Sequence, residues 1–261
     1  MDIIKIPRIN ALGKTGSEKA PNLILDELKK NYKNFSVLDF EEIHVDNSNI
    51  QESEQLIYQN CLEEFERQDK VVFIGGDHSM TYSIMKAFNE TFENSFLIVF
   101  DAHPDCMKPM IEPTNEEWLR AIVEEGFNPK NIILIGTRKI EDEEKEFLER
   151  KGIKYFFDFN DIEIFADVIT EKANGKNLYV SIDIDAVDPA FAPGVNYPES
   201  IGLTSKEFFY LLKRIFHISS LKAFDIVEVV PEIDEKYDFR TVKLASKVIQ
   251  TFLELKDGTK K

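Results

Sequence analysis

The stretch FLIVFDAHPD, residues 96–105, joins an apolar run to three side chains that can bind a metal ion. Residues 96–100 show no polar alternation, which is typical of a strand covered on both faces in a parallel sheet. In an extended continuation, side chains two positions apart point the same way, so Asp101, His103 and Asp105 can converge on one side. The segment therefore predicts a buried strand with metal ligands at its carboxyl end.

Two further apolar runs end in the same manner. VVFIGGDHS (71–79) leads to His78, and LYVSIDIDAVDP (178–189) leads to Asp183 and Asp185. A single strand-end aspartate is as often a turn residue or helix cap, and most isolated histidines are structural. Three such groups at strand ends favour a metal site, because ligand sites in open α/β sheets lie beyond the carboxyl ends of the strands. Four carboxylates and two imidazoles, without a thiolate, suit two divalent cations such as Mn²⁺ and hydrolytic chemistry.

Apolar runs alternate with amphipathic segments along almost the whole chain. We expect strands at 3–6, 35–40, 71–75, 96–101, 131–137, 153–158, 178–183 and 221–229, and helices at 20–30, 52–67, 80–93, 115–125, 142–151, 160–173, 205–216 and 240–255. This rhythm predicts a three-layer α/β fold with right-handed crossovers, and a closed eight-stranded barrel is the alternative. No linker or repeat divides the chain, so a single domain over residues 1–261 is expected, with a frayed end at DGTKK (257–261).

Composition narrows the classes of function. The formal charge of −16 and the pI of about 4.8 disfavour nucleic-acid binding. An acidic surface attracts cationic substrates, although it is more often simply a solvated surface. The sequence lacks a long apolar run and an apparent secretion signal, and Cys61 and Cys106 are interpreted as reduced thiols, so we expect a cytoplasmic protein without membrane segments.

Four segments resemble the ureohydrolase family, which includes arginase, agmatinase, guanidinobutyrase and formiminoglutamase. They are GGDHS (75–79), FDAHPD (100–105), SIDIDAVDPAFAPGV (181–195) and DIVEVVP (225–231), in the family's order. The resemblance implies a three-layer α/β/α sandwich with a mainly parallel eight-stranded sheet, two Mn²⁺ ions, and a homo-oligomer, either a trimer or a hexamer.

The same resemblance implies roles for individual residues. One ion would be held by His78, Asp101, Asp105 and Asp183, and the other by Asp101, His103, Asp183 and Asp185. A hydroxide between the ions would attack the guanidinium carbon of a small cationic substrate. Glu228 matches the glutamate that accepts a hydrogen bond from that guanidinium, although a strand-end carboxylate can also be a salt-bridge partner.

One position departs from the family pattern in a way that concerns catalysis. Agmatinase-like members carry a proton-transferring His twelve residues past the second His of the metal set, and this chain has Asn115 there. An amide is neither an acid nor a base near neutral pH, and general acid–base assistance contributes about 10²–10⁴-fold in rate. Alternatively, Thr114 or Asn115 is the N-cap of the following helix. His217 or a mobile acidic residue is an alternative proton carrier, but the position of His217 at a helix end favours a structural role.

The substrate side also departs from the pattern. Arginase-like members place an Asn after the DAHxD segment to bind the substrate carboxylate, whereas this chain continues with Cys106 and Met107. An agmatinase-like enzyme is therefore the favoured interpretation. A metal-binding protein with impaired turnover, another ureohydrolase and a related metal-dependent deacylase are the alternatives. Asp77 is expected to orient its loop or to bond a ligand His, and Asp188 is expected to be structural.

Overall fold

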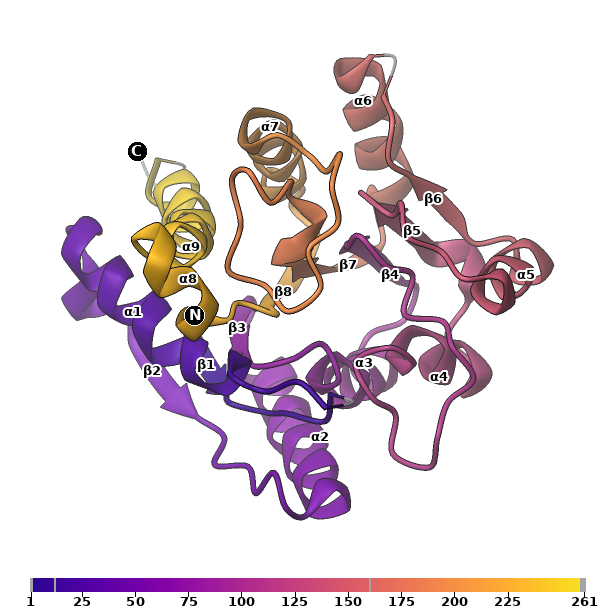
Figure 1. Ribbon diagram of the computed structural model, residues 1–261, viewed down its shortest axis with the longest axis horizontal. Coiled ribbons are helices and arrows are strands. Elements are labelled where there is room, and N and C mark those ends of the chain that lie inside the picture. The colour runs from indigo at the N-terminus through magenta and orange to yellow at the C-terminus, as the bar shows by residue number, and fades with distance from the viewer. Residues whose placement is uncertain (1, 12, 160, 259–261) are drawn as a thin grey trace.

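The computed structural model describes residues 2–11, 13–159 and 161–258. Within these residues, eight strands form one parallel sheet in the order β2-β1-β3-β8-β7-β4-β5-β6 (Figure 1). Their bounds are β1 Asp2–Ile6, β2 Asp39–Glu42, β3 Val71–Gly75, β4 Ser95–Phe100, β5 Ile132–Ile135, β6 Lys154–Phe156, β7 Asn177–Asp183 and β8 Leu221–Val227. Since the sheet is open at β2 and β6, the barrel alternative is wrong and the three-layer prediction is confirmed.

Helices cover both faces of the sheet (Figure 1). Their bounds are α1 Ala20–Asn31, α2 Ile50–Arg67, α3 Met80–Thr91, α4 Trp118–Glu124, α5 Asp142–Lys151, α6 Ile162–Ala173, α7 Ser205–Phe216, α8 Pro231–Asp234 and α9 Arg240–Gly258. Short 3₁₀ turns lie at Ser17–Lys19, Phe35–Val37, Pro129–Asn131, Ile184–Ala186 and Glu235–Tyr237. The last predicted helix is therefore longer than expected, and residues 259–261 of the expected frayed end lie outside the described residues.

The alternation of side chains along each strand separates two apolar cores. Ile3, Val72 and Ile98 pack in the core that also contains residues of α1, α6, α7 and α9. Their neighbours Ile4, Phe73 and Leu97 pack in the other core, with residues of α2, α3, α4 and α5. Because both faces of the central strands are buried, these strands read as continuous apolar runs in the sequence.

Two predicted elements begin three or four residues later than expected. The strand expected at 35–40 is a 3₁₀ turn at Phe35–Val37 followed by β2 at Asp39–Glu42, a half-exposed edge strand. Phe35 stacks on Phe40 with ring centroids 4.7 Å apart, so its apolar character serves local packing. The helix expected at 115–125 begins only at Trp118, because residues 114–117 form a turn.

The register of the central strands brings their carboxyl ends to one level. Ile74 of β3 pairs with Ile226 of β8, Asp183 of β7 pairs with Val227 of β8, and Phe100 of β4 pairs with Ile182 of β7. The chain crosses from β3 to β4 over the two strands β8 and β7, so the loops after four adjacent strands meet at one edge of the sheet. This arrangement is the usual position of a ligand site in an open α/β sheet.

No helix in the described ranges is long and apolar enough to cross a bilayer. Both Cys61 and Cys106 are buried thiols without a disulfide, which agrees with the expectation from composition. The single-domain organisation of residues 1–261 stays a prediction.

Candidate metal centre and substrate cavity

A tight turn after β3 presents His78. A Cβ on Gly76 would lie 2.0 Å from the carbonyl oxygen of Arg8, so only glycine fits between the two segments. The Asp77 carboxylate accepts hydrogen bonds from the backbone N–H groups of Asn10 at 2.5 Å and Ser79 at 3.1 Å. Asp77 therefore orients the loop, as one of its two expected roles required, and it does not bond a histidine side chain in any described contact.

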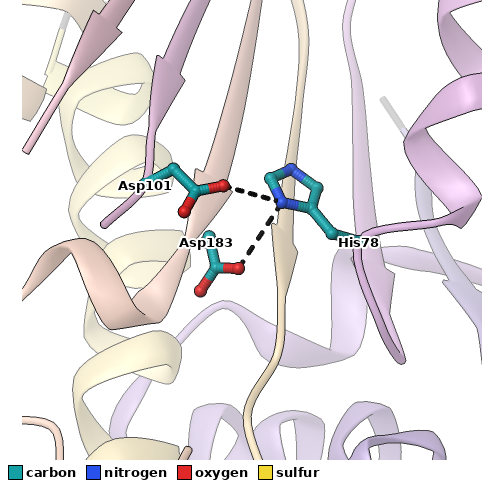
Figure 2. A group of neighbouring side chains, drawn as sticks. All are labelled: His78, Asp101 and Asp183. Carbon is teal, nitrogen blue, oxygen red and sulfur yellow. Dashed lines mark ion pairs between the residues drawn. The ribbon is translucent and has the colours of Figure 1, made fainter. Parts of the chain in front are cut away.

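His78 faces three carboxylates. Its Nδ1 lies 3.0 Å from Oδ2 of Asp101 and 3.0 Å from Oδ2 of Asp105. Oδ2 of Asp183 lies 3.4 Å from the same nitrogen. Figure 2 shows the carboxylates of Asp101 and Asp183 turned toward that one nitrogen from two neighbouring strand ends. One ligand atom each of His78, Asp101 and Asp183 lies within 4.8 Å of the other two, which is close enough for one metal ion.

A second group of the same kind surrounds His103. Its Nδ1 lies 3.0 Å from Oδ2 of Asp185 and 3.6 Å from Oδ1 of Asp101. Ligand atoms of Asp101, His103 and Asp185 again lie within 4.8 Å of one another. Asp101 belongs to both groups, as expected of a residue that bridges two ions, whereas Asp183, expected in both sets, belongs only to the first group. The structure thus brings together all six residues predicted as ligands, with Asp105 beside the first group.

Two residues that the sequence analysis missed orient His78 from behind. The Ser181 hydroxyl donates to Oδ1 of Asp225 at 2.7 Å. Its oxygen is therefore left to accept a hydrogen bond from Nε2 of His78, 2.8 Å away. This contact leaves the lone pair of Nδ1 directed at the carboxylates, which is the tautomer that a metal requires. Both residues lie in the motifs SIDID and DIVEV, but their contact depends on the pairing of β7 with β8.

Asp225 is a buried carboxylate satisfied by hydrogen bonds. Besides Ser181, it accepts bonds from the hydroxyl groups of Thr81 at 2.9 Å and Tyr179 at 2.7 Å, and from the backbone N–H of Ile182 at 3.2 Å. Burial nevertheless raises the pKa of Asp225. It places a negative charge behind the Ser181–His78 contact, which makes the imidazole a stronger ligand.

Asp105 is fixed by contacts on both sides. Its Oδ2 accepts a hydrogen bond from Nε1 of Trp118 at 2.7 Å, and its backbone has φ of 50°. The backbone N–H of the next residue, Cys106, donates to the Glu144 carboxylate at 2.9 Å. Glu144 also closes the capping box of α5. The first turn of α5 thereby holds the loop that follows β4.

The electrostatics of the centre call for cations. Burial and the Asp101 charge raise the pKa of Asp105 to about 8. Burial and the charges of Asp185 and Asp101 raise the pKa of Asp183. Burial opposes the charged form of His103, but the Asp185 and Asp101 carboxylates outweigh it and raise its pKa to about 12. The carboxylates thus carry more negative charge than the imidazoles can neutralise. The raised pKa values mean that these side chains keep protons in the metal-free protein, and metal ions would replace those protons.

The donor set fits a pair of divalent ions. Within the described part of the chain, Nδ1 of His78 and Oδ2 of Asp101 are buried without a hydrogen-bond partner. The Arg138 guanidinium donates to backbone carbonyls and not to these carboxylates; its acceptors are the carbonyls of Gly136, Ala186, Asp185, Glu199 and Ser200. The carboxylates therefore remain available, and oxygen and imidazole ligands without thiolate suit Mn²⁺.

The centre opens into a cavity of about 240 Å³. Its lining includes Asp105, Asp183, Asp185, Glu228 and Asn115. Glu228 has φ of 64°, and its Oε1 accepts a hydrogen bond from the backbone N–H of His78 at 2.9 Å. Its other oxygen, Oε2, is buried without a partner among the described residues. The two residues predicted to act on substrate, Glu228 and Asn115, therefore both border the space where a substrate would bind.

Three remaining predictions concern loop residues. The expectation that Thr114 or Asn115 caps α4 is wrong, because the N-cap is Glu117 and Asn115 lines the cavity instead. The structural role of Asp188 is confirmed, since its carboxylate accepts the N–H groups of Ala190 at 2.9 Å and Gly202 at 3.0 Å. His217 ends α7 and its Nδ1 lies 2.6 Å from the Lys213 carbonyl oxygen, which supports a structural role.

A parallel α/β sheet with imidazoles and carboxylates at its carboxyl edge is typical of metal-dependent hydrolases. The arginase family model matches residues 3–254. An uncharacterized 32.2 kDa protein of Methanothermus fervidus is 30% identical over 233 residues, covering 84% of this chain and 79% of the relative. The agmatinase of Bacillus subtilis is 32% identical over 185 residues, covering 69% of this chain and 61% of that enzyme. The crystal structure of arginase from Bacillus subtilis superposes with a TM-score of 0.87 at 20% identity, covering 97% of this chain and 98% of that one.

The chain belongs to the arginase family. Members of this family are hydrolases of C–N amidino bonds, and the chain is a ureohydrolase of that class.

Proposed function

We propose that the protein is a binuclear Mn²⁺ amidinohydrolase that converts agmatine to putrescine and urea. The relatedness to an agmatinase and the two ligand groups that share Asp101 support this proposal. Agmatine carries a guanidinium at one end and an ammonium at the other, so the substrate would be a small molecule with two positive charges and no carboxylate.

The charge of the cavity is the observation that carries the choice of substrate. Among the described lining residues, the carboxylates are Asp105, Glu116, Glu141, Glu144, Asp183, Asp185, Glu199 and Glu228. The one ammonium group among them, Lys139, pairs with Glu141 at 2.7 Å. Even with two divalent ions bound, the outer carboxylates would repel an amino-acid carboxylate and attract a second cation. Cys106 is buried and its thiol donates to the Pro104 carbonyl, so it offers no group to a substrate carboxylate.

The residues of the cavity suit a reaction in which water adds to the guanidinium carbon and the C–N bond to the amine breaks. The ions, when bound, would supply the Lewis acidity that activates water for this attack. Glu228 has an unpartnered Oε2 and would accept an N–H of the guanidinium, holding its carbon over the metal ligands. The leaving amine takes up a proton as urea forms, and Asn115 has no proton to give near neutral pH.

Asn115 also motivates a second candidate, a ureohydrolase-like metal-binding protein with impaired turnover. The position that would carry a proton shuttle holds an amide and borders the cavity. Loss of general acid–base assistance lowers a rate by about 10²–10⁴-fold. The two candidates share the metal centre and differ in the rate of urea release.

A substrate panel tests the proposed function. The protein loaded with Mn²⁺ is given agmatine, guanidinobutyrate, arginine and formiminoglutamate, and urea or formamide is measured against a blank of Mn²⁺ alone. We expect the largest kcat/KM with agmatine, because it alone in the panel carries two net positive charges. A preference for arginine or guanidinobutyrate would contradict the charge argument. If no member of the panel gives product, only the second candidate remains, a metal-binding protein with impaired turnover.

Other expectations from the sequence stay predictions. They are a cytoplasmic location, a trimeric or hexameric assembly, and the lack of nucleic-acid partners.

A further inference from the structure

Asn115 has a buried hydrogen-bond acceptor that the protein leaves unused. The residue is 6% exposed, and its Oδ1 has no hydrogen-bond partner among the described residues. A buried, unpaired polar atom costs about 1–3 kcal/mol of stability, and nearly all such atoms in native proteins find a partner. Asn115 also lines the cavity, so a substrate in the cavity is a source of a donor for this oxygen.

Hydrogen bonds fix the backbone on both sides of Asn115. The N–H of Glu117 donates to the Thr114 carbonyl at 3.3 Å, and the N–H of Met107 donates to the Glu116 carbonyl at 3.1 Å. The Glu117 carboxylate accepts the N–H of Thr114 at 3.1 Å. These contacts close the loop on both sides of Asn115.

The same loop is tied to the metal centre. The N–H of Leu119 donates to the Asp105 carbonyl at 3.2 Å, next to the bond from Trp118 to the Asp105 carboxylate. On the other side, Nδ2 of Asn10 donates to the carbonyls of Glu112 at 3.3 Å and Pro113 at 3.1 Å. Asn10 is the residue whose N–H binds Asp77. The position of Asn115 is therefore set relative to both Asp105 and His78.

We propose that Asn115 is a substrate-binding residue whose Oδ1 accepts an N–H of the cationic substrate, in the cavity that it shares with Glu228. This inference rests on the proposed function, because it requires an amidine or amine ligand. A guanidinium offers several N–H donors and no acceptor, so it complements the two unpartnered oxygens, Oδ1 of Asn115 and Oε2 of Glu228. At this position the Asn115 amide would bind the substrate instead of transferring a proton. It adds no charge to a cavity already rich in carboxylates.

The test compares Asn115→Leu, which removes the acceptor at similar size, with Asn115→Asp, which keeps an acceptor and removes the amide donor. In Mn²⁺-loaded enzyme we expect Asn115→Leu to raise the KM for agmatine about 10- to 100-fold, the range of a lost hydrogen bond to a charged group. Asn115→Asp should stay within about threefold of the wild type or bind more tightly. Asn89→Leu, an exposed change on α3, is the matched control and should leave KM unchanged.

Every other outcome overturns the inference. Equal KM values in all variants would mean that Oδ1 meets no substrate donor. An equal rise in KM in the Leu and Asp variants would mean that the amide N–H or the packing matters instead. If Asn115→Leu does not fold, Asn115→Ala takes its place. A structure of the Mn²⁺-loaded protein with agmatine should show the Asn115 oxygen within hydrogen-bond distance of a substrate nitrogen, and a water there instead would contradict the inference.

Failure of the proposed function is recognised separately. If the wild type releases no urea, turnover is lost, and the same variants are compared through the Kd of agmatine, measured calorimetrically with the Mn²⁺-loaded proteins. The expected ratios are unchanged. If agmatine neither reacts with nor binds to the wild type, the inference falls together with the proposed function.

Discussion

At the scale of single residues, the Ser181 hydroxyl decides which nitrogen of His78 faces the carboxylates. Its proton goes to Asp225, so its oxygen accepts from Nε2 of His78. Without this acceptor, the imidazole can place its proton on Nδ1 and pair with Asp101 or Asp105, which would block a metal ion. We therefore expect the hydroxyl to contribute to metal affinity without being a ligand.

Replacing Ser181 by alanine should weaken metal binding. We expect Ser181→Ala to raise the Kd of the protein for Mn²⁺ about 10- to 100-fold, because partners that orient ligand imidazoles typically contribute this much. Calorimetric titration of the metal-free protein with Mn²⁺ measures the change. Ser246→Ala in α9, at an equally buried serine away from the centre, is the control. Equal affinities in the two variants would refute the role of Ser181.

The sequence could predict the six candidate ligands because each follows an apolar run, and strand ends of a parallel sheet meet at one edge. It could not predict Ser181 or Asp225, since their role depends on the register in which Ser181 of β7 lies beside Asp225 of β8. For Asn115, the local residue pattern gave a wrong expectation. A polar residue before an amphipathic helix is typical of an N-cap, whereas the family resemblance placed Asn115 at a catalytic position, and the fold shows that it lines the cavity.

At the scale of elements, the turn after β3 positions His78 through a close backbone contact with the loop after β1. Gly76 packs against the Arg8 carbonyl, and the N–H of Asp77 donates to that same oxygen at 3.0 Å. The loops after β1 and β3 are therefore in direct backbone contact. Any side chain at position 76 must separate them and shift His78.

We expect Gly76→Ala to lower the free energy of unfolding by roughly 1–3 kcal/mol, the usual range for overpacking, and to weaken Mn²⁺ binding as well. Urea unfolding with and without Mn²⁺ measures both effects. Gly258→Ala is the control, because a Cβ there meets no atom within 4 Å. If the two alanine variants unfold at the same urea concentration, the close contact at Gly76 does not constrain the loop.

The elements that could be predicted best are the buried central strands, whose apolar runs are continuous. The error at β2 arose because an edge strand needs burial on fewer sides, so DFEE in Asp39–Glu42 carries charges and alternates half-buried with exposed positions. The apolar residues just before it pack locally as a 3₁₀ turn. Short edge elements are therefore poorly marked by hydrophobic pattern alone.

At the scale of the whole molecule, metal ions should determine how stability depends on pH. In the metal-free protein the pKa of Asp105 is raised to about 8 and that of His103 to about 12. Both groups are raised above their unfolded values, so the folded state holds protons that the unfolded state releases as pH rises. The unfolding free energy of the metal-free protein therefore falls as pH rises through the window in which both shifts act, about pH 6.5 to 8.

Removal of the metal with EDTA should lower Tm, and this loss should grow between pH 6 and pH 8. Bound Mn²⁺ replaces the retained protons and stabilises only the folded state, so Tm of the loaded protein should change less over the same range. Scanning calorimetry at several pH values, with and without EDTA, measures the difference. A constant difference in Tm would show that the carboxylates and imidazoles of the centre do not exchange protons for metal.

Asn10 connects the loop that carries His78 with the loop that carries Asn115. Its N–H holds Asp77, beside His78, while its amide holds the carbonyls of Glu112 and Pro113, just before Asn115. We therefore expect an ion bound at His78 and a ligand bound at Asn115 to stabilise each other's loops. By thermodynamic linkage, any factor by which the metal would raise substrate affinity is the factor by which the substrate would raise metal affinity, and Asn10 is one of the residues that connect the two loops.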